Sequence, residues 1–284
     1  MNCNILIRND TGFKFKHEGI EINHDGIKNS TTGTSLHIDP RDFTITDYIG
    51  KGNSGYVQRG FHKPTNMEVA IKVVNIYEKT LRHQLKSDLK VLIKSIHPNL
   101  VQFYGAFFYE GSVNIIMELM NYGSLSVLQR RMLQIQEKIP QPILAYIAIN
   151  MLKGLQYIHK IRHQIHRDIK PDNILLDLQG CVKLSDFGIS KSLESSFGIC
   201  HSYVGTVTYM SPERITGTAY SFSSDIWSFG LILYELFTQT YPYNSKGGSL
   251  ELIDSVMQYP EPSIVKSDET ALLSGFLCKM YDYT

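Results

Sequence analysis

The sequence is poor in cysteine and has no long apolar run. Its four cysteines, Cys3, Cys181, Cys200 and Cys278, lie far apart and include no CxxC pair. Neither a zinc site nor a disulfide framework is therefore indicated, and a reducing compartment is expected. The apolar run Ile5 to Ile7 is far too short for a signal peptide, and no later stretch could span a bilayer. We expect a protein of the cytoplasm, with the nucleus as an alternative, and no membrane partner.

The sequence also lacks an excess of charge of either sign. Its 28 basic and 27 acidic residues give a net charge of +1. Nucleic acid is not expected as the main partner, because proteins that bind nucleic acid usually carry a clear excess of basic residues. With 43% hydrophobic residues among 284, the chain can bury a large core, and division into two lobes is natural at this length.

Two polar motifs in the middle of the chain carry the chemistry. They are HRDIKPDN at 166–173 and DFG at 186–188. A carboxylate that accepts a hydroxyl proton, a lysine and an amide form the set that phosphoryl transfer requires. The triplet PDN alone would more commonly be a polar turn, but both motifs in this order favour catalysis. The candidates are Asp168 as proton acceptor, Lys170 as the cation facing the transferred phosphoryl group, and Asn173 and Asp186 as ligands of Mg²⁺.

A strand and a glycine-rich turn precede these motifs. Residues 43–47 alternate with period two and are followed by GKGNSGYV at 50–57. Glycines at these positions let the backbone approach phosphates. The same spacing marks dinucleotide sites, but those need a helix directly after the glycines, whereas residues 56–61 are strand-like. The sequence therefore favours a phosphate-binding hairpin.

Lys72 lies within the apolar strand-like run 69–74. Burying a lysine without a partner is costly, so Lys72 either points outward as an edge charge or meets phosphate and a carboxylate. The glycine hairpin before it favours the second alternative. Residues 78–94 carry leucines at three- and four-residue steps, which predicts a helix. Asp88 falls on its inward face and is the candidate partner of Lys72.

The N-terminal residues 1–42 mix short apolar pieces with polar turns, and we expect a weakly ordered extension there. Within it, Lys14 and Lys16 precede Ile20, Glu21 and Ile22, a basic-then-apolar pattern that could dock on a partner. A strand with Ile20 and Ile22 on one face is the commoner explanation of such a pattern.

The rest of the chain completes two lobes. Residues 100–108 and 113–119 are strand-like and would complete an antiparallel sheet. Residues 143–158 and 226–237 are apolar almost all round, which indicates buried helices. The segment 190–209 is rich in hydroxyls; it is either a solvated loop or a segment that phosphate orders against Arg167.

These motifs, together with VAIK ending at Lys72, MSPE at 210–213 and DIW at 225–227, resemble those of eukaryotic protein kinases from about residue 43 onward. The resemblance implies an α+β bilobal kinase fold. Its N-lobe (43–119) would be an antiparallel sheet plus one helix, and its mostly helical C-lobe (120–284) would be truncated at the C-terminal end. Lys170 implies serine/threonine activity.

FYGAF at 103–107, MELM at 117–120 and the stretch 203–215 resemble the mitogen-activated protein kinase kinases. That family phosphorylates threonine and tyrosine in the activation loop of a downstream MAP kinase. The resemblance implies ATP and Mg²⁺ as cofactors and an upstream MAP kinase kinase kinase as activator. It implies ATP contacts at Ile49, Gly50, Lys51, Gly52, Asn53, Ser54, Gly55, Tyr56, Val57, Ala70, Lys72, Met117, Glu118, Met120 and Leu175. It implies catalytic roles for Asp168, Lys170, Lys72, Asp88 and Thr206, and activating phosphorylation at Ser196 and Ser202.

Two departures from the family pattern leave alternatives open. Asp88 stands where relatives carry glutamate, and the missing methylene shortens its reach by about 1.5 Å. The sequence stops at Thr284, before the arginine that usually pairs with the glutamate at position 213, so we expect a fragment, a truncated product or a degenerate copy. The chain would be an active MAP kinase kinase, another serine/threonine kinase of the cascade, or a scaffold that binds ATP but transfers little phosphate.

Overall fold

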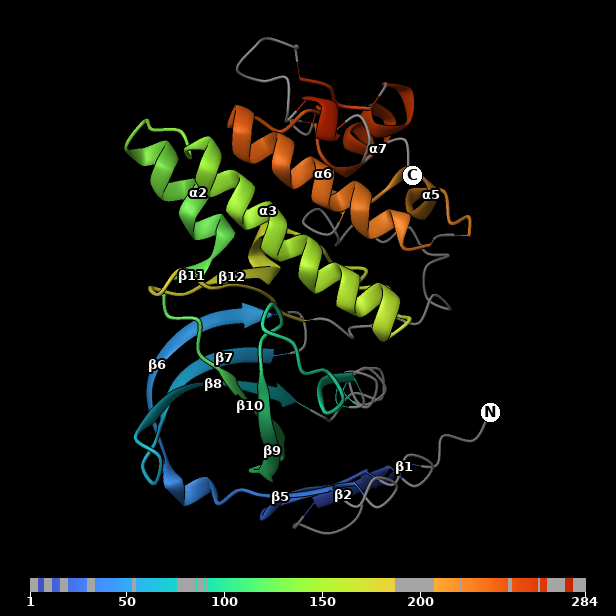
Figure 1. The fold of residues 1–284 in the computed structure, drawn as a ribbon. Helices are drawn as coiled ribbons and strands as arrows, with labels where there is room; N and C mark the ends of the chain where they lie inside the picture. The colour runs from blue at the N-terminus through green and yellow to red at the C-terminus, as the bar shows by residue number, and fades with distance from the viewer. Residues whose placement is uncertain are drawn as a thin grey trace. The chain divides into compact units, whose positions relative to one another are not determined.

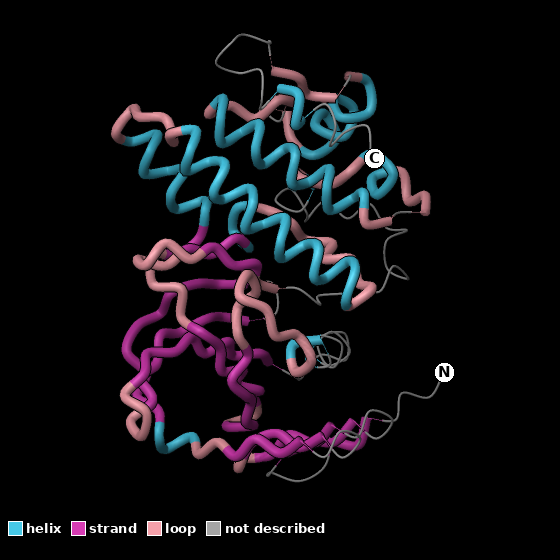
Figure 2. Tube along the Cα trace, in the orientation of Figure 1, coloured by secondary structure: helices cyan, strands magenta, loops and turns pink. Residues whose placement is uncertain are grey.

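The computed structural model describes residues 5–7, 12–15, 20–29, 34–52, 55–75, 85, 89, 91–186, 207–219, 221–244, 247–259, 261–264 and 274–277. The chain divides into two compact units (Figure 1). Unit 1 contains residues 1–96 and 101–121, and unit 2 contains residues 97–100 and 122–284. Strands predominate in the described part of unit 1 and helices in that of unit 2 (Figure 2). The predicted antiparallel sheet and mostly helical part are confirmed, whereas the predicted boundaries at residues 43 and 120 stay predictions.

The main sheet of unit 1 is antiparallel, with the strand order β6-β7-β8-β10-β9. Alternation along β8 puts Val69, Ile71 and Val73 on one face, where they form a buried cluster with Phe107 and Ile116. From the predicted helix 78–94, the described leucines at 85, 89 and 92 are helical and buried. The strands are β6 (Phe43–Gly52), β7 (Gly55–His62), β8 (Met67–Asn75), β9 (Phe103–Tyr109) and β10 (Ser112–Glu118), and a 3₁₀ turn, Pro40–Asp42, precedes β6.

A second antiparallel sheet precedes the main one in unit 1. It consists of β1 (Ile5–Ile7), β2 (Gly12–Phe15), β3 (Ile20–Asn23), β4 (Gly26–Asn29) and β5 (Thr34–His37), in that order. Strands β2 to β5 contact β9. Ile20 and Ile22 are buried on one face of β3. This burial agrees with the strand explanation of the pattern and not with exposed isoleucines that dock on a partner. The segment expected to be weakly ordered thus contains paired strands, and Ile20, Ile22 and Ile27 of β3 and β4 are buried.

Unit 2 combines a small sheet with helices. Strands β11 (Gly123–Ser124), β12 (Ile174–Leu176) and β13 (Val182–Leu184) pair in that order. The helices are α2 (Leu125–Gln134), α3 (Gln141–Gln156), α5 (Pro212–Ile215), α6 (Ser223–Thr238) and α7 (Ser249–Gln258); a π-helical turn, Tyr157–Ile161, continues α3, and the 3₁₀ turn Pro171–Asn173 precedes β12. Helix α3 contacts both α6 and β13 (Figure 1). In the described part of the chain, no helix is long and apolar enough to cross a membrane.

The prediction of two buried helices is confirmed for α6 but only in part for α3. Helix α6 is buried over most of its length, including Phe229 and Leu231, so that prediction is confirmed. For α3 the prediction is wrong on one face, because Ile143, Tyr146 and Ile149 are each about half exposed (49%, 50% and 52%). The other face of α3, with Leu144, Ile147 and Met151, is buried, and an apolar sequence alone cannot show which face another element covers.

Candidate active site

The loop that carries Asp168 is anchored by a buried carboxylate of α6. Asp225 is 1% exposed. Its Oδ2 accepts the His166 N–H at 2.7 Å and lies 2.7 Å from His159 Nε2, and its Oδ1 accepts the Arg167 N–H at 2.8 Å. A buried carboxylate is stable only when its oxygens are bound in this way. Asp225 therefore fixes the backbone of the two residues that precede Asp168.

The Asp168 carboxylate is oriented by the two polar residues that the sequence placed beside it. Lys170 Nζ donates to Asp168 Oδ2 at 2.7 Å, and Asn173 Nδ2 donates to the same oxygen at 2.9 Å. Asn173 Nδ2 also donates to the Asp168 carbonyl at 2.8 Å. The side chains of Asp168 and Lys170 keep 24% and 20% exposure. The carboxylate is thus held by charge-assisted bonds while still accessible to a substrate hydroxyl.

A hairpin brings the two predicted metal ligands to the same end of unit 2. Asn173 directly precedes β12 and Asp186 follows β13 by two residues. Ile174 pairs with Leu184, and the Ser185 N–H donates to the Asn173 carbonyl at 2.9 Å. Asp186 has a left-handed backbone, with φ of +54°. Carboxylate and amide oxygens are the ligands that Mg²⁺ prefers, so these two residues fit the ion.

The glycine-rich segment of unit 1 is a hairpin between β6 and β7, as predicted. Its register pairs Gly50 with Val57, Lys51 with Tyr56 and Gly52 with Gly55. Gly55 has φ of +158°, and a Cβ there would lie 1.8 Å from the Val73 carbonyl oxygen. Any other residue at position 55 would therefore displace strand β8.

Lys72 lies in β8 opposite Val57 of β7 and Ile115 of β10. It is 7% exposed, so the alternative of an outward edge charge is not what the structure shows.

The other predicted nucleotide contacts of unit 1 lie on the same sheet or directly after it. Ile49 lies within β6, and Ala70 of β8 pairs with Met117 of β10. Glu118 ends β10, and Met120 is buried in the segment that follows. Leu175 lies in β12 of unit 2.

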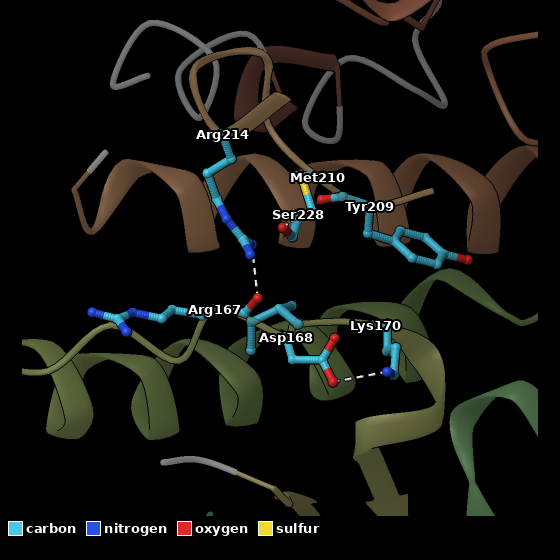
Figure 3. Close-up of a pocket in the computed structure, with 8 residues that line it drawn as sticks. Arg167, Asp168, Lys170, Tyr209, Met210, Arg214 and Ser228 are labelled. Carbon is cyan, nitrogen blue, oxygen red and sulfur yellow. Dashed lines mark hydrogen bonds and ion pairs between the residues drawn. The ribbon is translucent and has the colours of Figure 1, made fainter. Parts of the chain in front are cut away.

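A small pocket lies beside Asp168 in unit 2. It is lined by Arg167, Asp168, Ile169, Lys170, Tyr209, Met210, Arg214 and Ser228 (Figure 3). Ser228 Oγ donates to the Tyr209 carbonyl at 2.6 Å, and the Tyr209 hydroxyl donates to Glu235 Oε2 at 2.6 Å. Burial, and then the charge of Glu235, raise the pKa of the Tyr209 hydroxyl well above its usual range. These bonds hold segment 207–211 on α6, next to the catalytic loop.

Comparison with known proteins agrees with the fold. Residues 43–281 match the family described as protein kinase domain. Over 266 residues the chain is 41% identical to "Mitogen-activated protein kinase kinase 1" of Arabidopsis thaliana, which covers 87% of this chain and 74% of that protein. The chain belongs to the mitogen-activated protein kinase kinases. The predicted kinase fold is confirmed.

Other relatives of this MAP kinase kinase are longer than the chain. It is 40% identical to "Mitogen-activated protein kinase kinase 3" of Arabidopsis thaliana over 86% of the chain and 49% of the relative. It is 40% identical to "Dual specificity mitogen-activated protein kinase kinase 1" of Dictyostelium discoideum over 79% of the chain and 34% of the relative. The chain thus spans about half, or less, of the length of these two relatives.

Several predicted positions of this MAP kinase kinase lie outside the described residues. They are Asn53, Ser54, Asp88, Phe187, Gly188, Ser196, Ser202 and Thr206. The pairing of Lys72 with Asp88 and the two phosphorylation sites therefore stay predictions. For Glu213, the structure shows a different contact: its Oε1 accepts a hydrogen bond from Ser224 Oγ at the start of α6.

The sequence pattern missed the side chains that support Asp168 from a distance. The sequence marks Asp225 only as the first residue of the DIW motif. It indicates no role for the pocket residues Tyr209, Arg214 and Ser228. The sequence signal for them is weak, because it consists of polar residues in or beside the MSPE motif and of Ser228 between the apolar residues Trp227 and Phe229. Only the folded chain shows that these side chains meet the catalytic loop.

Proposed function

We propose that this MAP kinase kinase transfers the γ-phosphate of ATP to threonine and tyrosine in the activation loop of a downstream MAP kinase. The observation that carries the proposal is the geometry at Asp168, whose carboxylate is held by Lys170 and Asn173 while its backbone is anchored by Asp225. Such an arrangement supplies positioning and electrostatic stabilisation, which are the main demands of phosphoryl transfer.

Each group has a defined task in this proposal. Asp168 accepts the proton of the substrate hydroxyl. Lys170, whose Nζ lies 2.7 Å from Asp168 Oδ2, balances the charge on the transferred phosphoryl group. The glycine hairpin and Lys72 of unit 1 bind the nucleotide phosphates. Asn173 and Asp186 would hold Mg²⁺, which neutralises charge on those phosphates. Thr206 and the Lys72–Asp88 pair support catalysis. An upstream MAP kinase kinase kinase activates the protein by phosphorylating Ser196 and Ser202. We place this activation in the cytoplasm.

A phosphotransfer assay tests this proposal. The chain, with Ser196→Glu and Ser202→Glu to mimic phosphorylation, is incubated with labelled ATP and a catalytically inactive MAP kinase. Asp168→Asn is compared with Asp254→Asn, which removes an exposed acid of α7. We expect Asp168→Asn to lower the rate by about 10²–10⁴-fold, because general-base catalysis contributes that much, and Asp254→Asn to leave it unchanged. Equal rates for both variants would contradict the role of Asp168.

Two other outcomes separate the alternative functions. Transfer to threonine alone would indicate another serine/threonine kinase of the cascade. Thermal stabilisation by ATP without transfer would favour a scaffold, an alternative that rests on the short acid Asp88. In that case Asp88→Glu should restore transfer if reach is the only defect, and no gain would show that the short acid does not limit the protein.

A further inference from the structure

The residue before the catalytic aspartate has an unfavourable backbone conformation. Arg167 has φ of +70°, in the left-handed region that side-chain-bearing residues rarely occupy. Such a conformation persists only where surrounding contacts determine it. Any loosening of Arg167 would turn the peptide that joins it to Asp168, and with it the direction of the catalytic carboxylate.

Both backbone polar groups of Arg167 are bound by charged side chains. Its N–H donates to Asp225 Oδ1 at 2.8 Å, and its carbonyl accepts from Arg214 Nη1 at 2.7 Å (Figure 3). The carbonyl belongs to the Arg167–Asp168 peptide, so Arg214 acts on the bond directly next to Asp168. A guanidinium stays charged at all working pH values and forms a strong, directional bond to a carbonyl.

Arg214 also connects the catalytic loop to the segment that lines the pocket. It lies in α5, directly after segment 207–211, which contributes Tyr209 and Met210 to the pocket. Glu213, its neighbour in α5, accepts a hydrogen bond from Ser224 at the start of α6. Helix α5 is therefore fixed to the same end of α6 that carries Asp225, and the two charged contacts on Arg167 come from one connected framework.

We propose that Arg214 is a positioning residue for Asp168. It holds the carbonyl of Arg167 so that the carboxylate of Asp168 faces the substrate hydroxyl, and it makes this orientation depend on the placement of segment 207–211. A protein substrate that binds against that segment would thereby favour the catalytic geometry. This inference rests on the proposed function, because it concerns the same proton acceptor.

The test compares Arg214→Ala and Arg214→Lys with a matched control, Arg130→Ala. Arg130 also donates from its guanidinium to a backbone carbonyl, that of Ser126 at 3.3 Å, but at an exposed place on α2. We expect Arg214→Ala to lower kcat by about 10–100-fold, since small misplacement of a catalytic group has effects of this size. The KM for ATP should stay within twofold. Arg214→Lys should lie between Arg214→Ala and the parent, and Arg130→Ala should match the parent.

A double-mutant cycle separates positioning from a merely structural effect. If Arg214 acts through Asp168, Arg214→Ala should lower kcat less than twofold in the Asp168→Asn background. An equal loss in both backgrounds would overturn the proposal, as would a kcat for Arg214→Ala within twofold of the parent. If Arg214→Ala does not fold, Arg214→Lys gives the same comparison.

A readout that needs no activity keeps this inference separate from the proposed function. Hydrogen exchange of the peptide covering 164–173 should be about tenfold faster in Arg214→Ala than in the parent or Arg130→Ala, because the loop loses the hydrogen bond from Arg214 to the Arg167 carbonyl. Unchanged exchange would overturn the inference even if the parent is an active kinase. If the parent transfers no phosphate but exchange is still faster in Arg214→Ala than in the parent, the anchoring role of Arg214 is supported and the proposed function is rejected.

Discussion

Removal of the Asp225 carboxylate should destabilise unit 2 more than any single surface change. In Asp225→Ala, two backbone N–H groups and the ring of His159 lose an acceptor at 2.7–2.8 Å. Breaking a buried charged network by removing one partner costs about 3–5 kcal/mol. We therefore expect Asp225→Ala to lower the free energy of unfolding of unit 2 by about 3–5 kcal/mol. Asp225→Asn keeps one accepting oxygen and should lose about 1–3 kcal/mol.

The sequence provides a convenient probe for this measurement. Trp227 is the only tryptophan, and it is buried in α6 two residues after Asp225. Urea denaturation followed by its fluorescence reports the unfolding of unit 2. Asp254→Ala, on the exposed side of α7, should change the free energy of unfolding by less than about 0.5 kcal/mol. A loss below about 1 kcal/mol for Asp225→Ala, or equal losses for alanine and asparagine, would refute the reasoning.

Three further predictions concern the packing of each unit. Burial raises the pKa values of the Tyr209, Tyr241 and Tyr243 hydroxyls above their ordinary value of about 10. Because the folded state keeps protons that the unfolded chain releases, the free energy of unfolding of unit 2 should fall as pH rises above about 10; Trp227 denaturation curves that do not change between pH 8 and about 11 would contradict this. In unit 1, a Cβ at Gly105, where φ is +155°, would lie 2.1 Å from Ile38 Cδ1. Gly105→Ala should therefore speed hydrogen exchange in strands β4 and β5, whereas Gly50→Ala, which meets no atom within 4 Å, should not. Asn99 Nδ2 donates to Asn150 Oδ1 at 2.8 Å and to the Val182 carbonyl at 3.1 Å, so Asn99→Ala should lower the free energy of unfolding of unit 2 by about 1–3 kcal/mol, and a loss under about 0.5 kcal/mol would count against these bonds.

The residues predicted to act on the phosphoryl group could be placed side by side from the sequence alone. Asp168, Lys170 and Asn173 lie within six positions, and the structure brings them within hydrogen-bond distance through a single turn. The strands of unit 1 could likewise be predicted, since β8 contains a short run of apolar residues interrupted only by Lys72, which is typical of a buried strand. Local spacing suffices wherever function and folding depend on near neighbours.

The supporting contacts could not be predicted because they join residues far apart in the chain. Asp225 is 59 positions from His166, and Arg214 is 47 positions from Arg167. No periodicity or short motif encodes such pairs, and only the packing of α5 and α6 on the catalytic loop creates them. The exposed face of α3 was mispredicted for a related reason, since apolar residues alone do not show which face another element covers.

The most direct test of the account is to map the phosphate on the downstream kinase. An inactive MAP kinase is incubated with ATP and this chain carrying Ser196→Glu and Ser202→Glu, and its activation-loop peptides are analysed by mass spectrometry. The account predicts phosphate on both the threonine and the tyrosine, added about 10²–10⁴-fold more slowly when Asp168 is replaced by asparagine. Phosphate on neither residue, or undiminished phosphate with Asp168→Asn, would contradict it.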